Sequence, residues 1–281
     1  MGKKKRKKQK KQEIPDRHLL YSAAVQSPDT DLDFFERVYR RTRGERFRRL
    51  REDFCGTAAM ACEWVSRRKK NLAWGIDLDG PTLDWGRKRY VSRLGKDAER
   101  LTLMQANVLD STEPRVDVVA AQNFSYSVFK TRPDLSGYFR QVRRSLGSNG
   151  MFFLDAYGGT DAICEDEESR RIEATKALDG TKVPSFTYTW EQASFNPIDH
   201  HTVCHIHFKV RGKKLKRAFT YDWRLWTLPE LQELLLEAGF ARADVYVEGW
   251  DEEADDTDGV FRRRARFENM SGWVAYVVGT C

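Results

Sequence analysis

The stretch at residues 116–124, "VDVVAAQNF", is almost continuously apolar, which is typical of a strand buried on both faces of a sheet. Four more strand-like segments lie around it, at residues 47–54, 71–78, 101–108 and 151–157. Helix-like segments separate them, at 57–69, 81–95 and 133–147. Strands that alternate with helices in this way predict βαβ units and a parallel sheet with helices packed on its faces.

The pattern changes in the second half of the chain. Segments at 186–195, 202–210 and 216–223 alternate with period two, which predicts an antiparallel β meander inserted at about residues 180–223. A helix is predicted at 227–240, with a Thr cap, a Pro near its start and a Gly at its end. Strands at 243–250 and 273–280 then close the fold, and the acidic stretch 251–259 between them is read as a loop. We expect an α/β fold: a doubly wound, seven-stranded sheet with the inserted meander.

The charge of the chain is concentrated at its N-terminus. The formal net charge is +7, and residues 1–11 hold eight Lys or Arg and no acid, so the remainder is nearly neutral. We read 1–30 as a basic disordered tail and linker and 31–281 as one domain, which begins with a helix at 31–43. Such a tail can bind nucleic acid, direct localisation or merely aid solubility.

Two further properties bear on location. No apolar run is long enough to span a bilayer, so we expect no membrane association. The five cysteines are scattered without zinc or disulfide spacing, and no secretory signal is evident. These features favour a soluble, cytoplasmic protein with reduced thiols.

Polar residues stand at the ends of the predicted parallel strands, where open α/β sheets bind their ligands. Gly56 allows close approach of a ligand to the backbone, and the helix after it offers free N–H groups. Asp77 lies 21 residues further on, close to the spacing at which a carboxylate accepts hydrogen bonds from a ribose diol. Singly, Gly56 could be a tight turn and Asp77 a helix cap. Their occurrence at successive strand ends predicts a nucleotide-like ligand.

This ordered set resembles the class I S-adenosylmethionine-dependent methyltransferases. "EDFCGTA" keeps the acid and the central Gly56 of that family's loop, but Phe54 and Ala58 stand where glycines are usual. "GIDLD" is similar to the segment that binds ribose, "QANVLD" to the one that brackets adenine, and "DVVAAQNFSYSVF" to the one that faces the methyl donor. The last helix and two strands resemble the family's ending, so the resemblance covers about residues 45–160 and 218–280.

The resemblance implies a Rossmann-like methyltransferase sheet, S-adenosyl-L-methionine as cofactor and a small-molecule acceptor. It implies donor-binding roles for Glu52, Asp53, Cys55, Gly56, Thr57, Asp77, Leu78, Asn107, Val108, Gln122 and Asn123. The candidates for catalysis are Asn123, Tyr126 and Tyr157, although core packing is the plainer reading of the two tyrosines. No metal is expected.

The acceptor side is less defined by the sequence. Tyr21 could fold over the site as a lid, and the family commonly builds its acceptor pocket from an insert such as this one, near Trp190, Phe195, Trp223 and Trp226. On a strand, His205 and His207 share one face and Cys204, Ile206 and Phe208 the other. The two histidines are weak candidates for substrate contact, weaker ones for a metal, and a solvated sheet face remains the leading reading.

Three other functions stay open or are disfavoured. A nucleic-acid or protein methyltransferase could use residues 1–11 and the Arg37–Arg51 segment as an electrostatic guide. A non-catalytic protein could bind S-adenosylmethionine and transfer nothing. A nicotinamide dehydrogenase is disfavoured because the full G-x-G-x-x-G pattern is absent. The acceptor atom and the oligomeric state are not indicated.

Overall fold

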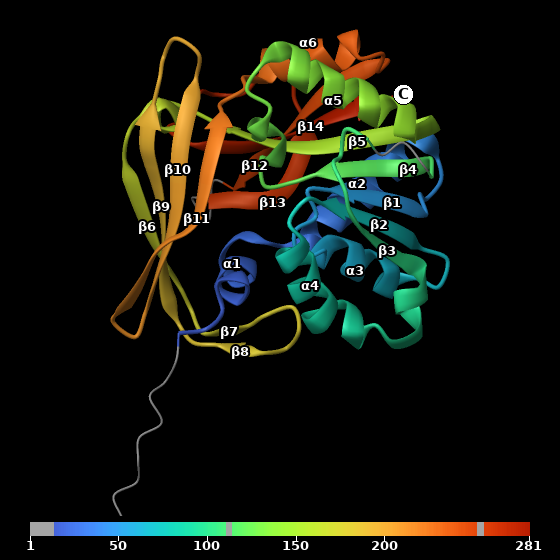
Figure 1. Ribbon diagram of the computed structural model, residues 1–281. Helices are drawn as coiled ribbons and strands as arrows, with labels where there is room; N and C mark the ends of the chain where they lie inside the picture. The colour runs from blue at the N-terminus through green and yellow to red at the C-terminus, as the bar shows by residue number, and fades with distance from the viewer. Residues whose placement is uncertain (1–13, 111–113, 252–255) are drawn as a thin grey trace, which may run out of the picture.

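A computed structural model describes residues 14–110, 114–251 and 256–281 of the chain. Its centre is an eight-stranded sheet in the order β13-β12-β14-β5-β4-β1-β2-β3 (Figure 1). Neighbouring strands among the first five along the chain pair in parallel, whereas β14, β12 and β13 are each antiparallel to their neighbours. The strands are β1 (Arg49–Asp53), β2 (Leu72–Asp77), β3 (Leu101–Gln105), β4 (Val116–Ala121), β5 (Leu146–Gly158), β12 (Arg242–Asp251), β13 (Asp256–Arg263) and β14 (Trp273–Thr280).

Helices cover both faces of this sheet, as the alternating pattern requires. One face packs against α2 (Pro28–Arg43) and α3 (Ala59–Arg67), with α4 (Gly80–Arg89) beside them. The other face packs against α5 (Arg132–Ser145) and α6 (Leu228–Glu237), which lie together above the sheet in Figure 1. Short 3₁₀ turns fill the connections: η1 (Val91–Arg93), η2 (Gly95–Arg100), η3 (Ser125–Val128) and η4 (Asp161–Ile163).

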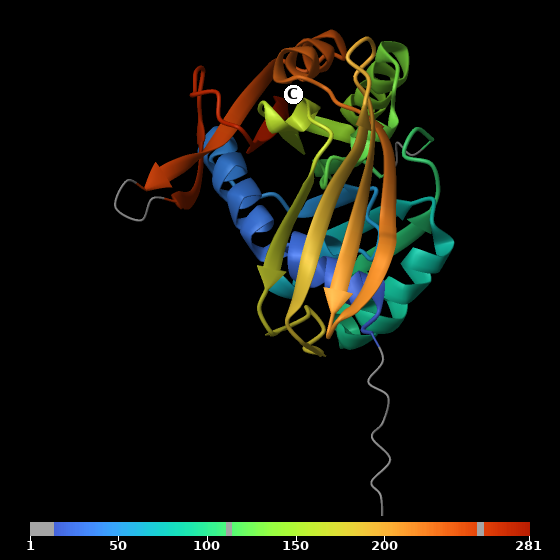
Figure 2. The same ribbon diagram turned by 90° about the vertical axis from the view of Figure 1, so that its left-hand side faces the viewer.

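A second sheet stands at the carboxyl ends of the parallel strands (Figures 1 and 2). It is antiparallel, in the order β11-β10-β9-β6, and contains β6 (Glu167–Ile172), β9 (Phe186–Phe195), β10 (His201–Val210) and β11 (Lys213–Arg224). A small hairpin of β7 (Thr175–Lys176) and β8 (Lys182–Val183) adjoins it. Helix α1 (Arg17–Val25) packs against its inner face, where Leu19 and Leu20 join the cluster of Ile206 and Phe208.

Local sequence signals account for several element boundaries. Gly44 ends α2 in a left-handed conformation with φ 74°. Thr227 and Glu230 form a reciprocal capping box at the start of α6. The N-terminal turn of α4 is capped by Asp79, whose side chain accepts a hydrogen bond from the Thr82 N–H. These caps satisfy helix-end N–H and C=O groups that the fold would otherwise leave unpaired.

The structure confirms the expected α/β architecture and corrects it in four places. The main sheet has eight strands instead of seven, because Asp256–Arg263 pairs with β12 where a loop was expected over 251–259. Residues 17–25 form a packed helix, not a linker. The helix predicted at 31–43 begins at Pro28. The insert holds a fourth strand, β6, ahead of the three predicted. The Lys-rich segment 1–11 lies outside the described residues.

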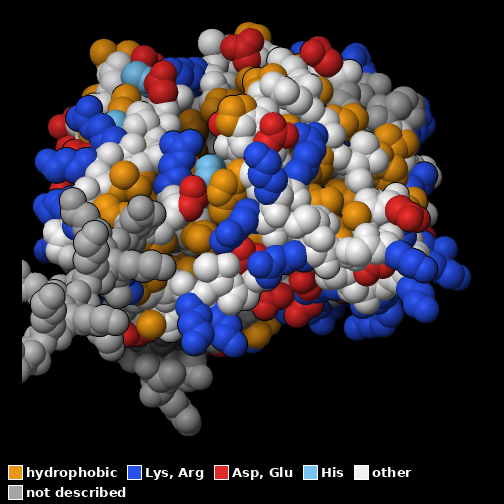
Figure 3. Space-filling view, turned by 60° about the horizontal axis from the view of Figure 1, so that its bottom comes forward, with side chains coloured by type: hydrophobic (Ala, Val, Ile, Leu, Met, Phe, Trp, Pro, Cys, Tyr) orange, Lys and Arg blue, Asp and Glu red, His pale blue; other side chains and the backbone are white. Residues whose placement is uncertain are grey.

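The surface carries mixed charge. On the face shown in Figure 3, Lys and Arg side chains gather at the right-hand rim, and Asp and Glu side chains lie among many of them. Within the described ranges, no helix is both long and apolar enough to cross a bilayer.

Candidate functional site

The candidate site lies at the carboxyl ends of β1, β2, β4 and β5. β1 pairs with β2 on one side and with β4 on the other. The chain after β1 leads through α3 to β2 and the chain after β4 leads through α5 to β5, in opposite directions along the sheet, so a switch point opens between β1 and β4. The second sheet and α1 face this edge (Figure 2). The main chain after each of these strands can therefore contribute to one shared space.

The loop after β1 is held by Asp77 at the end of β2. The Gly56 N–H donates to Asp77 Oδ2 at 2.7 Å, and the Asp79 N–H donates to Asp77 Oδ1 at 2.8 Å. Gly56 has φ 52°, and a β-carbon placed there would meet only Thr82 Cγ2, at 3.8 Å. Gly86 of α4 is tighter, because its β-carbon would lie 2.3 Å from the Thr57 carbonyl oxygen. Gly56 and Asp77, which lie 21 residues apart in the sequence, are thus joined by a direct hydrogen bond.

Two side chains stand where glycines are usual in the loop that this one resembles, and both have left-handed backbones. Phe54 has φ 55° and Ala58 has φ 58°, a region that costs a non-glycine residue about 1–2 kcal/mol. The Phe54 ring packs against Phe129 and Tyr138, at centroid distances of 6.1 and 5.5 Å. Ala58 is completely buried in the cluster beneath α2 and α3. Packing therefore holds the shape that glycine would otherwise allow.

This strain predicts that replacement by glycine changes stability by different amounts at two buried alanines, one in the loop and one in the helix after it. Ala58→Gly relieves the left-handed strain while losing one buried methyl, so we expect stability within about 0.5 kcal/mol of the parent. Ala61→Gly, inside α3, loses a methyl and helix propensity together and should cost about 1.5–2 kcal/mol. Urea denaturation of the two variants checks this, and equal destabilisation would contradict it.

The two acids that precede the loop both turn away from it. Glu52 is buried and accepts the Ala61 N–H at 2.9 Å, on the α3 side of the sheet. Asp53 is buried on the α5 side, where it pairs with Arg51 at 2.8 Å and accepts the Tyr138 hydroxyl at 2.9 Å. Arg51 and Tyr138 engage the Asp53 carboxylate, and the donor contact expected of Asp53 stays a prediction.

The remaining donor-side residues border the same edge in different ways. Leu78 follows Asp77 with its side chain 67% exposed, an apolar surface next to the loop. Asn107 caps its own turn by accepting the Leu109 N–H at 3.0 Å, and Val108 is buried behind it. Cys55 is buried, and its N–H donates to the Ile76 carbonyl. Thr57 is also buried, so its backbone, more than its side chain, is available at the edge of the site.

The turn after β4 is fixed by a carboxylate that the sequence reasoning missed. Asp155, near the end of β5, accepts the Asn123 N–H at 2.7 Å and the Phe124 N–H at 2.9 Å. Both donors have left-handed backbones, with φ 58° and 57°. Gln122 is buried and donates to the Phe153 carbonyl. A lone acid within the apolar run "MFFLDAY" was the available signal.

Buried carboxyl groups concentrate around this edge. Burial raises the pKa of Glu52 to about 8, of Asp155 to about 7 and of Asp31 to about 6. Asp31 adds to the rise in the pKa of the other two through charge repulsion, and Asp77 adds to that of Glu52. A cation bound at this edge would offset that repulsion.

Aromatic side chains bridge the two sheets beside that turn. Phe124 lies 4.7 Å from Tyr157 and 6.4 Å from Trp223 between ring centroids, and Trp223 stacks on Tyr221 at 4.2 Å. Tyr21 of α1 hydrogen-bonds to Tyr221. The Tyr157 hydroxyl is buried and has no hydrogen-bond partner among the described residues. We call these five residues the aromatic bridge.

Tyr126 and the insert histidines are not members of this bridge. Tyr126 is buried in the core cluster with α5 and α6. His205 bonds to Thr220 at 2.9 Å and His207 to Glu191 at 2.7 Å, on the face of β10 away from Cys204 and the inner cluster. Their predicted sharing of one face is right, but that face is the outer one.

Other residues considered for the acceptor pocket or a metal divide in the same way. Trp190 joins the bridge by packing on Tyr221, whereas Phe195 packs on His200 and Trp226 donates to the Phe129 carbonyl. In the part of the chain that the structure describes, no group of three potential ligands could hold a metal ion.

Comparison with known proteins finds no matching family model and no matching curated protein. Solved structures do match along nearly the whole chain. An S-adenosylmethionine-dependent methyltransferase from Clostridium acetobutylicum superposes with a TM-score of 0.64 at 15% identity, over 93% of this chain and 96% of that one.

Two sugar-modifying enzymes match similarly. An amino pentose methyltransferase of calicheamicin biosynthesis, from Micromonospora echinaspora, gives a TM-score of 0.65 at 12% identity, over 96% of this chain and 99% of that one. A sugar N-methyltransferase from a Streptoalloteichus species gives 0.62 at 15% identity, over 100% and 98%. At these identities the likeness is one of fold.

Proposed function

We propose that this chain, which has the fold of S-adenosylmethionine-dependent methyltransferases, is itself such an enzyme and acts on a small-molecule acceptor. The observation that carries the proposal is the contact between Asp77 and the Gly56 N–H at the switch point. It sets a ribose-binding carboxylate beside a loop whose backbone a ligand can approach. S-adenosylmethionine would supply an activated methyl group on a cationic sulfonium.

The residues at the strand ends suit such a donor. Asp77 retains acceptor capacity for ribose hydroxyls, since each carboxylate oxygen has two lone pairs. The exposed Leu78 offers an apolar surface to a flat base. A bound cation would favour the ionised forms of the buried carboxyls Glu52 and Asp155, whose pKa burial raises.

The acceptor would enter at the aromatic bridge. Its electron-rich rings stabilise a cationic methylated product, and they exclude water from the transfer. The unpartnered Tyr157 hydroxyl can bind a polar group of the acceptor. The names of two neighbours in the fold point to amines of amino sugars as the first acceptors to test.

The test is calorimetric titration of the full chain with S-adenosylmethionine and S-adenosylhomocysteine, followed by an acceptor screen. We expect micromolar binding of both, a free energy near −8 kcal/mol. Folded protein that binds neither would overturn the proposal. Donor binding with no turnover over a broad panel of amines, nucleic acids and proteins would favour a non-catalytic binder instead.

Tyr21 should affect turnover more than donor binding. Its ring lies on Phe219 at 4.9 Å and its hydroxyl meets Tyr221, so both contacts join α1 to the insert sheet on the proposed acceptor side. With an active acceptor, we expect Tyr21→Phe to lower kcat/KM about tenfold and to leave the donor Kd within about twofold. Tyr39→Phe, a buried tyrosine on α2, is the matched control. A parallel loss of donor affinity would contradict this assignment.

A further inference from the structure

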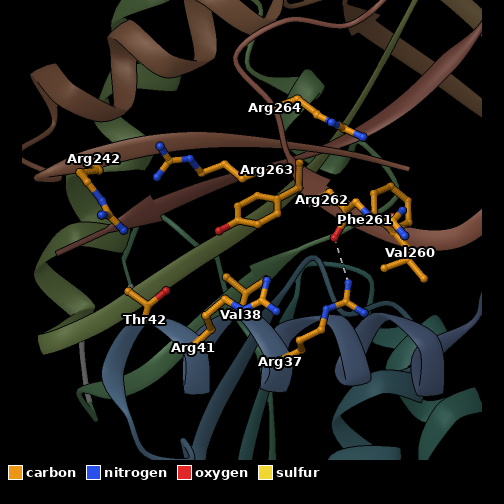
Figure 4. Close-up of a pocket in the computed structure, with 11 residues that line it drawn as sticks. Arg37, Val38, Arg41, Thr42, Arg242, Val260, Phe261, Arg262, Arg263 and Arg264 are labelled. Atoms are coloured by element: carbon orange, nitrogen blue, oxygen red, sulfur yellow. Dashed lines mark hydrogen bonds between the residues drawn. The ribbon is translucent and has the colours of Figure 1, made fainter. Parts of the chain in front are cut away.

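A cavity of about 660 Å³ lies between α2 and the β12–β13 edge of the main sheet (Figure 4). Arg37 and Arg41 enter it from the helix, and Arg242 and Arg263 from the strands. Arg37 donates to the Phe261 carbonyl at 3.0 Å, which fixes one guanidinium at the wall. We call this cavity the first groove.

The first groove carries more positive charge than its own carboxylates neutralise. Asp244 is shared by Arg242 and Arg263, at 3.5 and 3.6 Å. Among the described residues, no carboxylate forms an ion pair with Arg37 or Arg41. Like charges held together by a fold repel one another, and an anion between them removes that cost. The groove is therefore built to accept an anion.

A second basic cavity, of about 910 Å³, lies on the other side of the same helix. Arg46, Lys69 and Lys70 line it and have exposed side chains. Val38 of α2 lines the first groove and its neighbour Tyr39 lines this second groove, so the helix forms the ridge between them. Helix-dipole compensation accounts for arginines in the last turn of α2, but not for those on β12 and β13 or for the lysines.

We propose that the two grooves together bind the phosphodiester backbone of a nucleic-acid strand. A helix with its side chains is about 10–12 Å across, so the two grooves are separated by about one helix diameter. A single nucleotide would fill one groove, whereas a strand presents consecutive phosphates to both. Partly buried Tyr246 and Phe261 line the first groove and add aromatic surface for a base.

The position of the grooves makes the bound strand a tether and not the methyl acceptor. The second groove borders Arg49, Leu72 and Asp117, which lie at the amino ends of β1, β2 and β4. The candidate transfer site is at the opposite ends of those strands. This site is independent of donor binding, and it places a contact on the folded body in addition to any made by residues 1–11.

The test is anisotropy of a labelled single-stranded RNA of about 20 nucleotides, titrated with the full chain over a range of salt concentrations and without donor. The groove variant is Arg41→Gln, Arg263→Gln and Lys70→Gln together. The control is Lys209→Gln, Lys214→Gln and Lys216→Gln, three exposed lysines of the insert sheet with the same change in charge. Thermal melting and S-adenosylmethionine titration establish that both variants stay folded.

We expect the groove variant to bind at least tenfold more weakly near 0.15 M salt and its salt slope to fall by about 2, at roughly 0.7 per lost phosphate contact. The control should stay within about threefold of the parent. Equal binding by all three proteins would overturn the proposal and assign RNA binding to residues 1–11. Full displacement of the RNA by millimolar tripolyphosphate would overturn the proposal and favour a small phosphorylated ligand. Displacement by polyglutamate equal to that by unlabelled RNA would overturn it and favour an acidic protein. In a separate reaction with S-adenosylmethionine added, methylation of the RNA would overturn its role as a tether.

Discussion

Replacing Asp53 by alanine is expected to lower the free energy of unfolding by about 3–5 kcal/mol, a large part of the stability of a typical domain. Arg51 and Asp53 are both buried, and their ion pair is 2.8 Å long. Arg51 also donates to Ser145 Oγ at 2.6 Å, and Tyr138 donates to Asp53. Removing the carboxylate leaves a guanidinium in the core without its counter-charge.

Urea denaturation measures the effect against two further variants. Asp84→Ala breaks an exposed pair with Arg87 and should cost under about 1 kcal/mol. Arg51→Met combined with Asp53→Leu removes both charges and should recover most of the loss. Donor binding by folded Asp53→Ala protein should persist, because this carboxylate does not face the loop. A cost below 1 kcal/mol would show that the pair is not buried as described.

Replacing Asp77 by alanine is expected to weaken the binding of S-adenosylmethionine and S-adenosylhomocysteine at least tenfold, about 1.4 kcal/mol. The carboxylate has two tasks in the proposed site. It accepts the Gly56 N–H, which holds the loop, and it retains lone pairs for a ribose diol. Both ligands carry that ribose, so both should lose affinity alike.

Asp79→Ala is the matched control for this experiment. It removes the same charge two residues away, but Asp79 caps α4 through Thr82. We expect a loss of about 1 kcal/mol in stability and donor affinity within about threefold of the parent. Unchanged donor binding by Asp77→Ala would contradict the role of Asp77 in binding ribose, on which the proposed function rests.

Period and spacing predicted the parallel half of the fold because β2, β4 and β5 carry apolar residues that are buried between the helices. The edge strand β13 was not predicted, because "DTDGVFRR" is charged and lacks an apolar pattern. Charged residues on an exposed sheet edge prevent further pairing. Helix α1 was not predicted, because nine residues next to a basic run have little intrinsic tendency to form a helix. Its stability comes from packing Leu19 and Leu20 under the insert sheet.

The same distinction holds at the candidate site. Gly56 and Asp77 could be paired from sequence because adjacent parallel strands bring such positions together. The task of Asp155 depends on β5 lying beside β4, which no local pattern states. For His205 and His207, alternation showed which residues share a face. Only the packing of α1 determined which face looks inward.

The left-handed backbones at Phe54 and Ala58 have a consequence for how such chains diverge. A glycine at these points adopts the left-handed conformation without strain. Here packing against neighbouring residues holds that conformation, and for Phe54 the neighbours are Phe129 and Tyr138. Once neighbours enforce the geometry, the glycines are free to mutate. The recognisable signature can then erode while the architecture stays the same. We therefore expect substitutions in the loop to be tied to those of the aromatic residues that hold it.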